Sequence, residues 1–60
     1  MKFKIEIVRD DGSVVYRMSV DEMSPNRAKT KATALVNLYA SRGATGARVL
    51  NDKGQELYKL

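Results

Sequence analysis

An Asp-Gly dipeptide lies between two runs of alternating apolar and polar residues near the start of this chain. Residues 2–8 and 14–20 both show the two-residue period of a strand with one buried face. Asp-Gly is a strong signal for a two-residue type I′ hairpin turn, which needs positive φ at both central positions. With Asp11 and Gly12 as the loop, the large apolar residues of both runs fall on one face. The predicted pairs are Phe3 with Val20, Ile5 with Met18, and Ile7 with Tyr16.

A helix is predicted over residues 24–42. Ser24 is suited to cap a free backbone N–H, and Pro25 loses no hydrogen bond at the first helical position. Gly43 follows the last turn, where glycine commonly ends a helix. Between these ends, apolar residues recur with the helical period and form one stripe. The stripe consists of Ala28, Ala32, Leu35, Val36 and Tyr39.

A second hairpin is predicted at the end of the chain, with strands at residues 47–50 and 55–60. Residues 51–54 fit a type I turn that ends in a left-handed glycine. With the first hairpin and the helix, this completes an α+β fold of the order ββαββ, a single domain over residues 1–60. A right-handed crossover favours an antiparallel four-stranded sheet in the order 2-1-3-4, with the helix packed on one face.

The register of the second hairpin is open between two alternatives. A loop over residues 51–54 places Val49 opposite Leu57 on the helix side, and Leu50 and Tyr58 then point to the other face. A two-residue loop would instead place Leu50 opposite Leu57. We favour the first register.

The pattern of a strand, an Asp-Asp-Gly-Ser turn, an alanine-spaced helix and the final segment at residues 47–57 resembles a group of small uncharacterised bacterial ββαββ proteins. The resemblance implies the same fold. It implies no activity and no site residue, because the group has no functional motif. The wholly basic helix of this chain departs from the mixed or acidic helix of that group.

The composition argues against several classes of function. The chain has no cysteine and no histidine, so it lacks disulfides, thiolate metal ligands and the commonest general base. No apolar run approaches the roughly 18 residues that span a bilayer, so no membrane partner is predicted. The first residues alternate instead of forming a signal peptide, and we expect a cytoplasmic protein.

Catalysis also finds little support in the sequence. Most acidic residues fall in predicted turns or just before the helix, where they serve backbone geometry and the helix dipole. The glycine-rich segment at residues 42–46 leaves a helix and lacks the Gly-Lys-Ser/Thr of a phosphate-binding loop. We therefore predict no enzyme, no cofactor and no metal site.

The net charge of +4 comes from the helix segment alone, because residues 24–42 hold four bases and no acid. Arg27, Lys31 and Arg42 are predicted along one flank of the apolar stripe, and Lys29 on the other. Such a row is suited to contact a nucleic-acid backbone or an acidic protein surface. The alternative interpretation is a solvated helix face whose aliphatic stems cover the core edge.

One helix covers only one face of a four-stranded sheet, so the other face is predicted to be open. Its apolar members form a patch of the kind that marks an interface. We expect a non-catalytic interaction protein, and two forms are open: a homodimer through this face or by pairing edge strands, and a monomer whose partly apolar outer face is solvated. The predicted partner face contains Val15, Leu50, Tyr58 and Leu60.

Overall fold

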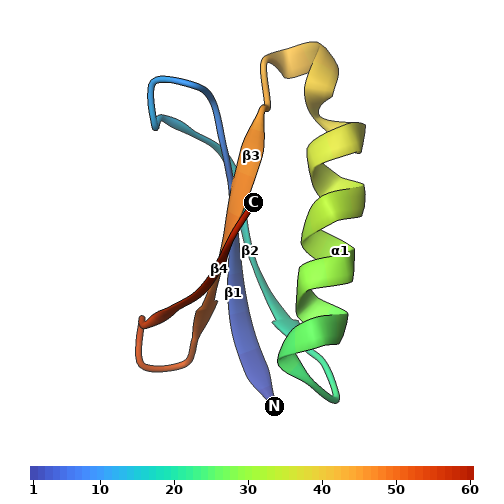
Figure 1. Ribbon diagram of the computed structural model, residues 1–60, viewed down its shortest axis with the longest axis vertical. Coiled ribbons are helices and arrows are strands. Elements are labelled where there is room, and N and C mark those ends of the chain that lie inside the picture. Colours follow the sequence, from blue (N-terminus) through green and yellow to red (C-terminus); the bar gives the residue numbers. More distant parts are fainter.

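The computed structural model describes residues 1–60 and contains a four-stranded antiparallel sheet with one helix against one face (Figure 1). The sheet order is β2-β1-β3-β4, so the predicted ββαββ fold and strand order are confirmed. The helix of this structure is too short and too polar to span a bilayer. The strands are β1 (Lys2–Val8), β2 (Val14–Asp21), β3 (Gly46–Asn51) and β4 (Glu56–Lys59), and the helix is α1 (Pro25–Leu38).

The buried core lies between α1 and the two central strands. α1 packs mainly against β3 and β1, and its two fully buried residues, Ala28 and Ala32, face them. Small side chains at these positions allow the helix backbone to approach the sheet closely. The sheet contributes the larger buried side chains, which are Phe3, Ile5, Ile7, Val20 and Val49.

The first hairpin has the predicted register along most of its length, with Phe3 opposite Val20 and Ile5 opposite Met18. Its turn differs from the prediction. Only Gly12 has positive φ, at 84°, so Asp11 does not meet the requirement of a type I′ turn. The Asp11 carboxylate instead accepts a hydrogen bond from the Ser13 N–H at 2.9 Å, which favours a longer turn. The register then shifts by one residue at the end of β1.

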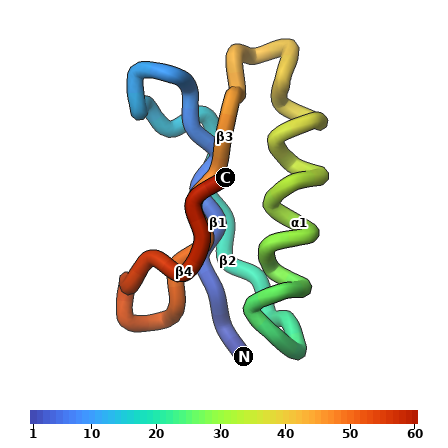
Figure 2. The backbone as a smooth tube through the Cα atoms, in the orientation of Figure 1, coloured from blue at the N-terminus to red at the C-terminus, as the bar shows by residue number.

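The second hairpin has the same turn geometry, as predicted for residues 51–54. The Gly54 N–H donates to the Asn51 carbonyl at 3.0 Å, and Gly54 has a φ of 82°. Figure 2 shows the two hairpin loops at opposite ends of the sheet, both turned away from the helix.

The predicted register of this hairpin is wrong in both of its alternatives. Val49 pairs with Tyr58 and Leu50 pairs with Glu56, because the register shifts at Leu57. One extra residue at a β-bulge reverses the face of every side chain beyond it. Tyr58 therefore lies on the helix side and not on the open face.

The helix begins as predicted and ends in a tighter turn. The Ser24 hydroxyl accepts a hydrogen bond from the Arg27 N–H at 3.3 Å, and Pro25 occupies the first turn. The α-helix ends at Leu38, and a 3₁₀ turn η1 (Ala40–Arg42) continues to Gly43, which has a φ of 91°. The predicted boundary at Gly43 is thus confirmed for the helical region as a whole.

We expect Ile5→Ala to lower the free energy of unfolding by about 2–5 kcal/mol, because it empties a fully buried site between sheet and helix. Urea unfolding followed by circular dichroism measures this loss. Val14→Ala, at an exposed position of β2, is the matched control and should cost far less. Equal losses in the two variants would contradict the described core.

Candidate functional site

The four basic residues of the helix segment do not form one continuous row. Lys29 packs on the β4 side, with its Nζ 5.0 Å from the centre of the Tyr58 ring. Arg42 lies in η1, beyond the α-helix, and its guanidinium is 5.8 Å from the ring of Tyr39. Arg42 thus lies beyond the regular α-helix that the predicted flank assumed. Arg27 and Lys31 remain together on the other side of α1.

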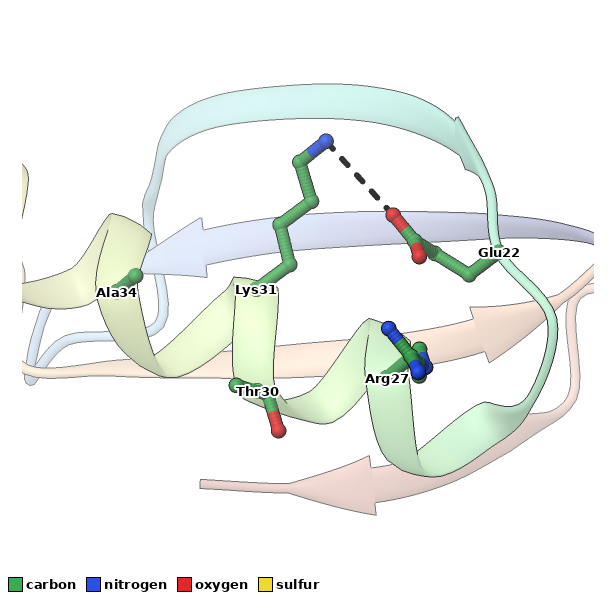
Figure 3. A pocket seen from close by; sticks show the side chains of 5 residues that line it. All are labelled: Glu22, Arg27, Thr30, Lys31 and Ala34. Atoms are coloured by element: carbon green, nitrogen blue, oxygen red, sulfur yellow. Dashed lines mark ion pairs between the residues drawn. The ribbon is translucent and has the colours of Figure 1, made fainter.

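A shallow hollow of about 360 Å³ lies beside these two residues, between α1 and the segment that precedes it. In Figure 3 the Lys31 side chain extends toward Glu22, and the two charged groups are 3.8 Å apart. Glu22 thus balances part of the charge that the sequence assigned to the helix. Surface side chains line the hollow, and they do not include the hydrogen-bonded pair of a nucleophile and a base that a catalytic site needs. Its lining residues are Glu22, Arg27, Thr30, Lys31 and Ala34.

The predicted apolar partner face is not formed. Val15 and Tyr58 are half-buried against the core, and Leu60 pairs with the buried Ala47 through backbone hydrogen bonds. Of the predicted members, only Leu50 lies on the open face, where it pairs with Lys4 and Glu56. The bulges near Val15 and at Leu57 explain this correction, since the prediction assumed uninterrupted alternation along β2 and β4.

The open face carries an ion-pair network in place of an apolar patch. The Glu6 carboxylate, in the central strand β1, accepts hydrogen bonds from Arg17 at 2.9 Å and from Arg48. Arg48 also lies 3.8 Å from the Glu56 carboxylate. Partial burial of Glu6 by itself would raise the pKa of its carboxyl, but the hydrogen bonds from Arg48 and Arg17 outweigh it and the pKa is lowered. These pairs join β2, β1, β3 and β4 across the open face.

The two edges of the sheet differ in how far they expose pairing groups. β4 has four residues and a bulge, features that discourage addition of another strand. β2 has eight residues, no proline, and a register shift only at its hairpin end. Long unblocked edge strands are templates for pairing with a further chain. β2 is therefore the open edge of this molecule.

The hydrogen bonds between β2 and β1 show which backbone N–H and C=O groups of β2 point toward the free edge. The Glu22 N–H donates to the Met1 carbonyl at 2.9 Å. Because hydrogen-bonded pairs alternate along an antiparallel ladder, the backbone groups of every second residue before Glu22 also point toward β1. The alternate residues Arg17, Ser19 and Asp21 therefore direct their N–H and C=O groups toward the free edge. Their side chains share the open face of the sheet with Glu6, which pairs with Arg17 in the register.

The other face of β2 is only partly covered, because α1 packs over β1 and β3. Met18 is half-buried there, and Tyr16 is 37% exposed. The Tyr16 ring stacks on Tyr39 with ring centres 4.9 Å apart, which closes the hairpin end of the gap between β2 and α1. Apolar surface thus lies directly beside the free backbone groups of the edge.

Comparisons with protein-family models, with curated proteins and with solved structures find no match to this chain. The resemblance to small bacterial ββαββ proteins stays a prediction. The candidate site rests on the edge residues Arg17, Ser19 and Asp21, which the sequence analysis did not single out. The signal that could have found them was the predicted order 2-1-3-4, which already placed residues 14–20 at an edge.

We expect Glu6→Gln to lower the free energy of unfolding at neutral pH by about 1–3 kcal/mol, because it removes the charge that Arg17 and Arg48 contact. The pKa of Glu6 is lowered in the folded state, so its contribution is present above its ordinary pKa. That contribution is lost as the pH falls through the lowered pKa. Urea unfolding of both proteins at several pH values measures the difference.

The matched control is Glu56→Gln, which removes a longer and more exposed contact to Arg48 and should change stability little. A difference between the wild type and Glu6→Gln that persisted unchanged into strong acid would contradict the role of the carboxylate charge.

Proposed function

We propose that this chain is a non-catalytic interaction protein that binds an extended strand of its partner along the free edge of β2. The observation that carries the proposal is the outward direction of the backbone groups at Arg17, Ser19 and Asp21 on an eight-residue edge strand. Strand addition takes its affinity from such main-chain hydrogen bonds and its specificity from alternate side chains.

The surroundings of the edge support this mode of binding. An added strand would place half of its side chains over Met18 and Tyr16, where the helix leaves apolar surface uncovered. The other half would lie beside the charged side chains of the open face. A domain of 60 residues with ten buried residues also has little core of its own, and a bound strand would add to it. A cytoplasmic location belongs to the same proposal and fits a chain without cysteine.

Nucleic acid and acidic protein surfaces receive less support as partners. Lys29 packs on Tyr58, Lys31 faces Glu22, and Arg42 lies beyond the α-helix, so the four bases do not track one line. A backbone of regularly spaced phosphates is best matched by a continuous row of unpaired bases.

We expect Ser19→Pro to abolish strand binding and to leave the fold intact. Proline removes the N–H that points toward the free edge and spares the ladder to β1, and edge strands tolerate it for this reason. The probes are short synthetic peptides with alternating apolar and charged residues, titrated into dilute ¹⁵N-labelled protein. Binding should shift the amide signals of Arg17, Ser19 and Asp21.

Ser19→Ala is the matched control, because it removes the hydroxyl and keeps the N–H. Peptide binding should survive in this variant and be lost in Ser19→Pro, while circular dichroism shows both to be folded. Shifts confined to α1 or to the open face, or equal binding by the two variants, would contradict the proposal.

A further inference from the structure

We infer that the strand bound at this edge is β2 of a second copy, paired antiparallel about a two-fold axis at Ser19. The inference rests on the proposed function, because it names the partner of the same edge. Three features of β2 support it: the direction of its backbone groups, its charged residues and its apolar residues. In one register, each of these features matches the same feature of a second copy.

The direction of the backbone N–H and C=O groups of β2 permits this pairing. Arg17, Ser19 and Asp21 all direct their N–H and C=O groups toward the free edge. With the axis at Ser19, each of these residues faces an outward residue of the second copy. Ser19 pairs with Ser19, and Arg17 pairs with Asp21 in both directions. Every free backbone group of this segment then has a partner.

The charges select this register among the two-fold alternatives. An axis at Arg17 would place two guanidinium groups opposite each other, and an axis at Asp21 would place two carboxylates opposite each other. An axis at Met18 or Val20 would set a charged residue opposite Ser19. Only the axis at Ser19 places Arg17 opposite Asp21 of the second copy, on the same face of the sheet, where opposite charges stabilise pairing.

Both charged groups are available for this contact. Arg17 bonds to Glu6 through its Nε, and its side chain is 60% exposed. Asp21 accepts the N-terminal ammonium at its Oδ1, and its side chain is 65% exposed. Each group therefore keeps further polar atoms for a partner across the edge.

On the helix side of the sheet, the residues that meet in this register are apolar. Met18 faces Val20 of the second copy, at a position without hydrogen bonds where opposite side chains approach most closely. The two helices lie on the same side of the joined sheet, each over its own β1 and β3, so the half-buried Met18 keeps surface for this contact, whereas Val20 is already buried in its own core. The dimer would form one continuous eight-stranded sheet whose remaining edges are the short, bulged β4 strands.

Charged substitutions at the axis test this arrangement, because Ser19 is the one outward residue that meets its own copy. In Ser19→Asp, two carboxylates face each other across the axis, and in Ser19→Lys, two ammonium groups do. Each variant alone should raise the dissociation constant of the dimer by about fivefold or more. An equimolar mixture should form heterodimers in excess of the statistical proportion, as measured by native mass spectrometry.

Sedimentation equilibrium of the wild type, from low micromolar to near-millimolar concentration, supplies the reference dissociation constant. Asn37→Asp and Asn37→Lys introduce the same charges at an exposed position of α1 and should leave that constant unchanged. Circular dichroism shows whether each variant is folded.

Two results would overturn the inference. A wild-type chain that stays monomeric throughout, while peptides still shift the β2 amides, would leave the proposed function standing and exclude the second copy as partner. A dimer that the Ser19 variants do not weaken, or a mixture without excess heterodimer, would place the contact elsewhere or in another register.

Discussion

A single helix of fourteen residues covers the two central strands of this sheet and no more. Its two buried alanines bring the backbone close to β1 and β3, where the largest fully buried side chains are Ile5, Ile7 and Val49. Because the helix is centred there, neither edge strand receives a full cover. The arrangement of the core thus determines which parts of the molecule remain open to a partner.

The two edge strands, β4 and β2, differ in length and regularity. β4 is short and bulged, and Tyr58 within it packs against the core and Lys29. β2 is twice as long as β4 and keeps Arg17, Ser19 and Asp21 in regular alternation. The open face is held together by Glu6 and its arginine partners, so it presents charge where a sheet-to-sheet interface would need apolar surface. The edge is therefore a better interface than the face.

Much of the fold could be predicted from the sequence. Alternation on both sides of the Asp-Gly turn identified the first hairpin and its main register, and Ser24, Pro25 and Gly43 marked the ends of the helical region. The predicted type I′ turn was wrong, because that type needs positive φ at Asp11 as well as at Gly12, and only Gly12 has it. Periodic patterns of apolar residues predict regular strands and helices well, and the first hairpin and the helix are mostly regular.

The edge of β2 follows from the predicted strand order, but the predicted partner face and basic residues depend on irregularities that the sequence does not reveal. One extra residue at Leu57 transfers Tyr58 to the helix side, and that single shift removes the aromatic residue from the predicted partner face. The position of Arg42 beyond α1 follows from the end of the α-helix at Leu38, and the partial neutralisation of Lys31 follows from its contact with Glu22, which precedes the helix. Bulges and helix ends are decided by tertiary packing and by local hydrogen bonds, which a pattern of apolar residues does not record.

An isotope-filtered nuclear Overhauser experiment on a sample that mixes labelled and unlabelled chains tests directly whether the β2 strands of two copies pair. We expect a contact between the Hα of Met18 in one copy and the Hα of Val20 in the other, since these residues face each other at a position without hydrogen bonds. Intermolecular contacts that involve Leu50 and its neighbours on the open face, without any from β2, would contradict it.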